Sequence, residues 1–230
     1  MSLKRIRLWD LPTRLFHWLL VLSVIAAIIS GQLGGGLIDW HGRIGLLIIG
    51  LLAFRLVWGL IGSTYARFAQ FFPTPAKIRA YLKGEWHEPG HNPLGAFSVF
   101  GLLAVLLIQA ALGLFANDDI AFKGPLFDLV DKSLSNRLTG LHHLIANLLF
   151  ILIGLHVAAI AFYAIVKKDN LVRPMLTGDK EVNNGQDARG GGLIALIVAL
   201  LLAGAAVYGA SGDWLPPPPP PPPAAEVPSW

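Results

Sequence analysis

The sequence predicts an all-α integral membrane protein, and composition and charge pattern carry this prediction. Hydrophobic residues make up 54% of the 230 residues, charged residues make up only 14%, and the mean hydropathy is +0.60. Such values are untypical of a soluble globular domain. Charges are also absent from long stretches, each of which exceeds the ~20 helical residues that cross a bilayer core of ~30 Å. These stretches are residues 15–38, 90–117, 138–166 and 190–212, with a fifth, 44–66, that contains only Arg55.

From these stretches we expect four transmembrane helices and a fifth, C-terminal one. The first spans about residues 13–31, and a glycine-rich hairpin over 31–36 leads to the second, at about 39–62. A short helix at the lipid headgroups is expected over 75–83. The third helix begins at Pro93 with Asn92 as its cap. The remaining elements are an apolar, acid-bearing loop at 116–138, the fourth helix at about 139–166, a polar connection at 167–189 and the fifth helix at about 191–210.

The basic residues indicate the orientation of the chain. Thirteen of the eighteen lysines and arginines precede the first helix, separate the second from the third, or separate the fourth from the fifth. By the positive-inside rule the N-terminus is cytoplasmic and the C-terminus is outside. The charges follow the membrane side rather than forming a patch, which argues against nucleic-acid binding. The long first apolar run, without a small-residue cleavage site, reads as a signal anchor.

The chain contains no cysteine. This excludes disulfides, thiolate metal sites, iron–sulfur clusters and the C-x-x-C-H attachment of c-type haem. A redox cofactor would therefore be held by histidine, methionine or oxygen ligands.

Four histidines lie in the expected helices at two depths. His142 and His156 are fourteen residues apart in one helix, so they face within about 40° of each other and lie ~21 Å apart along the axis. His143 points about 100° away from His142, so it is a surface residue or a residue that supports a ligand, or it is itself the ligand if this helix is distorted. The expected topology places His41 beside His142 in the outer half of the membrane, and His17 beside His156 in the inner half.

A pair of imidazoles from facing helices is what a six-coordinate b-type haem requires. We therefore expect two haems, one held by His17 and His156 and the other by His41 and His142. The alternative for any single histidine is a hydrogen-bonded residue at a membrane surface, and the matched depths favour the haem interpretation. Zinc would need two further ligands at each depth.

Three arginines are candidates for pairing with haem propionates. Arg55 lies fourteen residues after His41 and so shares its helix face, at the cytoplasmic level. Its alternative is a side chain that extends to the inner headgroups. Arg14 near the cytoplasmic surface and Arg43 near the outer surface have the same two explanations: pairing with a haem propionate, or a side chain that extends to the headgroups.

The other aromatic and histidine residues have simpler explanations. His87 and His91 lie in a cytoplasmic segment, where histidines are usually solvated. Trp18, Trp40 and Trp58 lie at helix ends and fit an aromatic belt.

Several segments have residue motifs that are more specific than an apolar composition. They are Arg-Leu-Phe-His-Trp at 14–18, His-Gly-Arg-Ile-Gly at 41–45, the run from 65–68 to Gly-His-Asn-Pro-Leu-Gly at 90–95, and 142–156 followed by Lys-Asp-Asn-Leu-Val-Arg at 168–173. This pattern resembles the bacterial cytochrome b561 family, most closely the branch of b-type cytochrome subunits of nickel-iron hydrogenases, over about residues 8–180. The resemblance implies a four-helix transmembrane bundle that holds two b haems and exchanges electrons with quinone. Carried over by position, the family's haem ligands are His17, His41, His142 and His156.

These observations predict a membrane-bound dihaem b-type cytochrome of the bacterial inner membrane. It would act as an electron-transfer subunit between an external, periplasmic redox protein, such as a c-type cytochrome or a hydrogenase-like protein, and the quinone pool. Residues 1–180 would form the haem-bearing domain, 181–212 a linker and the fifth helix, and 213–230 a tail with a stiff polyproline rod at 216–223. The alternatives are a self-contained oxidoreductase that couples a small external substrate such as superoxide to quinone, a transporter with a histidine proton relay, and a non-redox membrane anchor.

Overall fold

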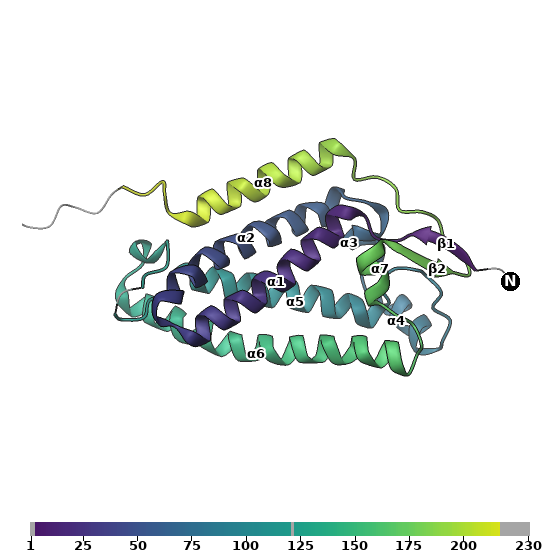
Figure 1. Ribbon diagram of the computed structural model, residues 1–230, viewed down its shortest axis with the longest axis horizontal. Coiled ribbons are helices and arrows are strands. Elements are labelled where there is room, and N and C mark those ends of the chain that lie inside the picture. The colour runs from purple at the N-terminus through teal and green to yellow at the C-terminus, as the bar shows by residue number, and fades with distance from the viewer. Residues whose placement is uncertain (1–2, 121, 217–230) are drawn as a thin grey trace, which may run out of the picture.

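The computed structural model describes residues 3–120 and 122–216, and these are mostly helical (Figure 1). Within them, five helices are long and apolar enough to cross a membrane. They are α1 (Leu11–Leu33), α2 (Ile38–Ile61), α5 (Pro93–Gly113), α6 (Lys132–Ile165) and α8 (Leu193–Ser211). The expected polyproline rod at 216–223 lies outside the described residues except for Pro216.

Shorter elements gather at the two ends of the helices (Figure 1). One end, called the loop end below, consists of the α1–α2 turn at 34–37 and the loop at 114–131, which includes a 3₁₀ turn at Phe127–Leu129. The other, called the sheet end, is formed by β1 (Lys4–Arg7), α3 (Phe68–Phe71), α4 (Pro75–Leu82), α7 (Val172–Thr177) and β2 (Asp179–Val182), with a 3₁₀ turn at Thr64–Ala66. The short helix expected over 75–83 is confirmed as α4.

Side-chain caps set where three long helices begin. The Asp10 carboxylate accepts a hydrogen bond from the Thr13 amide at 2.6 Å, and the Asn92 side chain accepts one from the Gly95 amide at 2.8 Å. Such caps satisfy amides that have no partner within the helix. The expected start of the third long helix, with Asn92 as cap and Pro93 following, is confirmed.

The fourth long helix begins earlier than expected. Asp131 caps α6 by accepting from the Leu134 amide at 2.9 Å, so the helix starts at Lys132 and not near Thr139. The expectation of a loop through residue 138 is therefore wrong in its last seven residues. The first two turns of α6 are polar, and hydropathy detects only the apolar part of a helix.

The turn between α1 and α2 is as tight as its glycines indicate. Gly34 and Gly35 have φ angles of +61° and +56°, in the left-handed region that residues with a Cβ rarely adopt. A 3₁₀ turn, Gly35–Leu37, then leads directly into α2.

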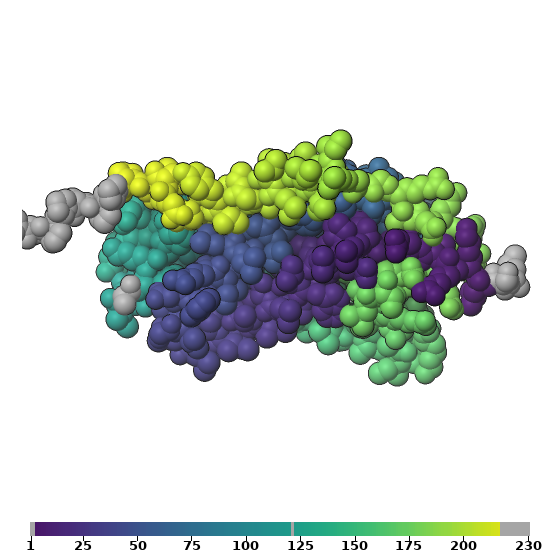
Figure 2. Space-filling model, turned by 45° about the horizontal axis from the view of Figure 1, so that its top comes forward, coloured from purple at the N-terminus to yellow at the C-terminus, as the bar shows by residue number. Residues whose placement is uncertain are grey.

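The α2 helix is the centre of the packing. It contacts α1, α5 and α8, and α6 packs against α5. In one buried cluster Phe54 and Trp58 of α2 meet Ala199 and Ala203 of α8. A Cβ atom on Gly50 would lie only 2.7 Å from Val207 of α8, so the glycine lets the two helices come close. Figure 2 shows α8 as an outer ridge along α2.

The connection between α6 and α8 contains more structure than predicted. The sequence predicts only a polar connection over 167–189, but this segment forms α7 and β2. Strand β2 pairs antiparallel with β1, with Lys4 opposite Val182 and Arg7 opposite Asp179. The strands have four residues each and are mostly charged. Their apolar alternation is therefore too short to be recognised.

Asp10 also joins the ends of two helices. Its Oδ2 atom accepts hydrogen bonds from Trp58 Nε1, at 3.1 Å, and from the Ser63 hydroxyl. Trp58 is 1% exposed, so its assignment to an aromatic belt is wrong. The carboxylate thus ties the start of α1 to the end of α2.

We expect Asp10→Ala to lower the free energy of unfolding by about 2–4 kcal/mol, because it removes a helix cap and leaves two donors unpaired. The measurement is the denaturation midpoint of the purified protein in detergent. Asp128→Ala, at an exposed position of the loop end, is the control and should change stability by less than about 0.5 kcal/mol. Equal midpoints for the two variants would contradict the role of Asp10.

Candidate functional site

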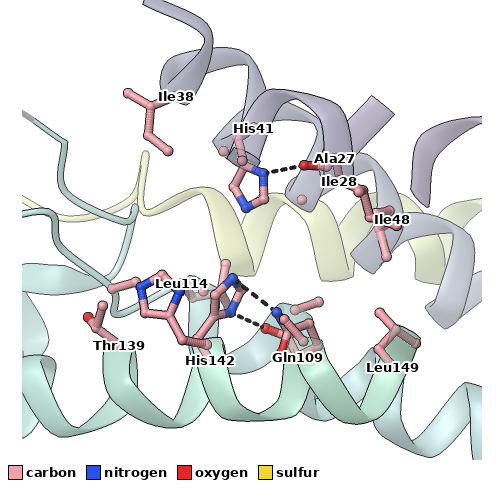
Figure 3. A pocket seen from close by; sticks show the side chains of 18 of the residues that line it. Ala27, Ile28, Ile38, His41, Ile48, Gln109, Leu114, Thr139, His142 and Leu149 are labelled. Carbon is pink, nitrogen blue, oxygen red and sulfur yellow. Dashed lines mark hydrogen bonds between the residues drawn. The ribbon is translucent and has the colours of Figure 1, made fainter. Parts of the chain in front are cut away.

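A cavity of about 250 Å³ lies at the loop end between α1, α2, α5 and α6. His41 of α2 and His142 of α6 both line it, with their ring centres 6.0 Å apart and their planes at 85° (Figure 3). The structure therefore brings together the two histidines that the sequence placed at the outer depth. Most other lining side chains are apolar, among them Val24, Ile48 and Leu149.

The hydrogen bonds of both rings indicate the same tautomer. His41 Nδ1 donates to the Ala27 carbonyl at 2.8 Å, and His142 Nδ1 donates to the Gln109 carbonyl at 2.9 Å (Figure 3). A carbonyl oxygen only accepts, so each Nδ1 carries the hydrogen and each Nε2 keeps its lone pair. Histidines that bind metals commonly donate their second ring nitrogen in this way.

Gln109 also contacts the other nitrogen of His142. Its side-chain amide donates to His142 Nε2 at 3.1 Å (Figure 3). Its Oε1 atom is buried without a hydrogen-bond partner among the described residues. A metal ligand role for His142 requires this amide to leave Nε2.

Two glycines make room for the two rings. A Cβ atom on Gly31 would lie 3.0 Å from the His41 ring, and one on Gly113 would lie 3.1 Å from Cε1 of His142. Each distance is shorter than ordinary van der Waals contact. In the sequence, Gly31 and Gly113 do not differ in their local pattern from other glycines of the chain, so their role follows only from the structure.

The second expected pair lies toward the sheet end. His17 is in the second turn of α1, and its Nδ1 atom is buried without a hydrogen-bond partner among the described residues. His156 Nδ1 is 3.2 Å from the Ser98 hydroxyl of α5. A positive charge on His156 would disfavour one on His17, so the two rings lie in the same region of the structure.

The α5 helix supports both histidines of α6. Ser98 and Gln109, its only residues with polar side chains, contact His156 and His142 respectively. They are eleven residues apart, so they face within about 20° of each other. This spacing can be recognised in the sequence, because no other residue of the helix has a polar side chain.

His91 is not a solvated loop residue, and that expectation is wrong. Its ring lies between Trp9 and Phe71, with ring centres at 4.8 and 4.6 Å, and its Nδ1 atom is buried without a described partner. Burial lowers the pKa of His91 to about 3, and the charges of Arg55, His156 and His17 add to the effect. His91 is therefore a third histidine near the sheet-end pair.

The three predicted arginines have different surroundings. Arg55 is 4% exposed, donates to the Ala66 carbonyl at 3.0 Å and lies 4.5 Å above the Phe68 ring, so it does not extend to the headgroups. Arg14 donates to the Leu176 carbonyl, and its Nε atom is buried without a described partner. Arg43 is exposed at the loop end, 5.2 Å from the Trp40 ring.

The separation of the two loop-end rings matches that of two imidazoles on one iron, provided that the Gln109 amide leaves His142 Nε2. With metal–nitrogen bonds of about 2 Å, the ring centres of two opposed imidazoles lie about 6 Å apart. The rings of His41 and His142 have this separation, and hydrogen bonds fix Nδ1 as the protonated nitrogen of each. The apolar lining suits a porphyrin.

Comparisons with known proteins agree on one family. A family model described as prokaryotic cytochrome b561 matches residues 8–178. Similar proteins include probable Ni/Fe-hydrogenase B-type cytochrome subunits of Azotobacter chroococcum mcd 1, 27% identical over 74% of this chain and 86% of the relative, and of Rhizobium leguminosarum bv. viciae, 21% identical over 78% and 90%. The probable Ni/Fe-hydrogenase 1 B-type cytochrome subunit of Escherichia coli K12 is 24% identical over 47% of this chain and 59% of the relative. No solved structure matches.

We expect His91 to make stability depend on pH. The unfolded chain binds a proton at this residue below pH ~6.5, whereas the folded chain binds it only near the folded pKa of about 3. Stability should therefore fall as the pH drops below ~6.5, by up to about 1.4 kcal/mol per pH unit.

The measurement compares thermal midpoints of the wild type and His91→Phe between pH 7 and pH 4.5. The variant should lose less stability at low pH, while His87→Phe, at an exposed position, should behave as the wild type does. If wild type and His91→Phe changed equally with pH, the low pKa of His91 would be wrong.

Proposed function

We propose a function from one premise: the chain belongs to the prokaryotic cytochrome b561 family, which makes it a b-type haem protein of electron transport. The proposed function is electron transfer by two b haems between an external redox protein and the quinone pool. The observation that carries it is the facing of His41 and His142 across an apolar cavity, each with Nδ1 bonded to a backbone carbonyl.

The residues of the chain have distinct roles in this proposal. A bound b haem supplies one-electron transfer. His41 and His142 would hold the haem iron at the loop end, and His17 and His156 would hold the haem iron at the sheet end. The Ala27 and Gln109 carbonyls orient the loop-end rings, and the Ser98 hydroxyl orients His156.

The arginines supply positive charge for the haem propionates. Arg14 and Arg55 lie toward the sheet end, and Arg43 lies at the loop end, so each proposed haem has at least one guanidinium at its level. Arg14 Nε still lacks a partner among the described residues. A carboxylate would form a charge-assisted hydrogen bond there.

The orientation and the partners complete the proposal. With the sheet end at the cytoplasmic surface of the bacterial inner membrane, the basic N-terminal segment obeys the positive-inside rule. The loop end then faces the periplasm, where a hydrogenase-like protein or a c-type cytochrome would exchange electrons with the nearer haem. The names of the hydrogenase cytochrome subunits among the relatives support the former. We keep residues 1–180 as the proposed haem-bearing unit, 181–212 as a linker with the fifth helix, and 213–230 as a tail.

We expect two low-spin b haems per chain, because two histidine pairs can each complete an iron. Pyridine haemochrome analysis of the purified protein measures the number, and a reduced-minus-oxidised spectrum separates a cytochrome from a transporter or an anchor. His41→Ala and His142→Ala should each leave one haem and the same residual spectrum. His17→Ala and His156→Ala should leave the other.

His143→Ala is the matched control for this series. His143 follows His142 in the sequence and lines the same cavity, but its ring points about 100° away, so neither haem should require it as an iron ligand. One haem or none in the wild type would contradict the stoichiometry. Loss of a haem in His143→Ala but not in His142→Ala would contradict the assigned pair.

We also expect Gly113→Ala to weaken the loop-end haem selectively. The added methyl group would press on the His142 ring and disturb its bond to the Gln109 carbonyl. Haem content after prolonged detergent washing should fall by up to half. Gly101→Ala in the same helix, where nothing lies within 4 Å of the new Cβ atom, should retain both haems. Equal retention by the two variants would show that His142 tolerates the crowding.

A further inference from the structure

The outward face of α6 is unusual for a helix that faces lipid. Figure 1 shows α6 at the edge of the molecule, packed against α5 on its inner side. Few residues of its most apolar stretch are fully buried and many are exposed, so one side of the helix has no protein neighbour among the described residues. One would expect this surface to consist of large apolar side chains.

Along one strip of this surface, polar and small residues alternate at regular spacing with two larger apolar ones, Phe150 and Val157. Alternate steps of four and three residues, the pattern of a helix–helix seam, connect exposed positions along the whole helix. We call this set the α6 seam: Asn136, Gly140, His143, Asn147, Phe150, Gly154, Val157 and Ala161. Large apolar residues, including Leu144, Leu148 and Leu155, occupy the neighbouring exposed strip.

Asn147 is the central residue of the α6 seam. Its side chain is exposed and has no hydrogen-bond partner within residues 3–120 and 122–216. It lies between His142 and His156, well inside the apolar part of the helix. An amide left unpaired in hydrocarbon costs several kcal/mol, so this position calls for a polar partner.

We propose that the α6 seam is the interface of a parallel homodimer in which Asn147 of one copy hydrogen-bonds to Asn147 of the other. A carboxamide carries both donors and an acceptor, so two copies related by a two-fold axis satisfy each other. All copies insert in the same direction, which places each seam residue beside its own counterpart. A single asparagine in such a seam is known to fix register and dimeric state.

The glycines agree with this arrangement. Gly140 and Gly154 lie seven residues before and after Asn147, and a Cβ atom on either would meet nothing within 4 Å. In a membrane, small residues at an interface let two helices come close enough for packing and interhelical hydrogen bonds. The seven-residue repeat corresponds to a left-handed crossing near +20°.

A second copy is a better fit than a different apolar helix. A partner with only aliphatic side chains would leave the Asn147 amide unpaired, whereas a second copy supplies the complementary group at the same depth. His143 and Phe150 belong to both the α6 seam and the lining of the loop-end cavity. The dimer interface would therefore border that cavity.

The absence of cysteine makes a cross-linking test direct. Single cysteines at Gly154 and Ala161 are introduced on the α6 seam, and matched cysteines at Leu155 and Phe162, one residue further, serve as controls at nearly equal depth. Each full-length protein is oxidised in native membranes and separated under non-reducing conditions. Gly154→Cys and Ala161→Cys should form disulfide-linked dimers, and Leu155→Cys and Phe162→Cys should not. Equal cross-linking at the control positions, or none at the seam, would overturn the proposal.

A second measurement tests the amide without a cross-link. Asn147→Leu should weaken dimerisation in dilute proteoliposomes, counted by single-molecule photobleaching, by about threefold to tenfold. Asn147→Gln should retain most of it, because it keeps both donor and acceptor. A reduced-minus-oxidised spectrum like that of the wild type shows that each variant is folded. An unchanged dimer fraction in Asn147→Leu would remove Asn147 from the interface, and a monomeric wild type would reject the dimer.

Discussion

The structure depends on one constraint: polar groups inside apolar helices must find partners within the protein, because hydrocarbon offers none. Asp10 shows how this is met at the sheet end, where one carboxylate accepts from the Thr13 amide, Trp58 and Ser63. The buried guanidinium of Arg55 donates a hydrogen bond to the Ala66 carbonyl and lies over the Phe68 ring. These contacts join residues of α1, α2 and the segment after α2, so the same bonds that satisfy polar groups also set the helix positions.

The same constraint fixes the chemistry of the histidines. A carbonyl holds Nδ1 of His41 and another holds Nδ1 of His142, which leaves Nε2 of both rings as the basic nitrogen. Helices supply these carbonyls where a neighbouring glycine allows the ring to come close, as Gly31 and Gly113 do. Seven buried polar atoms have no hydrogen-bond partner among the described residues. Oε1 of Gln109 lies at the loop-end cavity, and the others belong to Thr13, Arg14, His17, Arg67, Trp86 and His91.

The sequence predicted the features that follow from periodicity and missed those that follow from contacts between distant segments. Hydropathy located the apolar helices, and the spacing of His142 and His156 placed them on one face. The polar start of α6 and the strands β1 and β2 were not predicted, because these segments contain too few apolar residues to show a hydropathy signal or a period. The burial of His91 was not predicted, because Trp9 and Phe71, whose rings pack against it, are far from it in the sequence. The polar pair of α5, Ser98 and Gln109, was detectable in principle, since the rest of that helix has no polar side chain.

The α6 helix carries two polar patterns with different consequences. Its inner face repeats histidine after fourteen residues, and both histidines find partners on α5. Its outer face has Asn147 midway between two glycines, and that amide has no partner in the described part of the chain. Because His143 and Phe150 border both the cavity and the outer face, the two patterns meet at the loop end. Substitutions that change the outer face there would therefore also change the wall of the cavity, which couples the packing of α6 against a neighbour to the environment of His142.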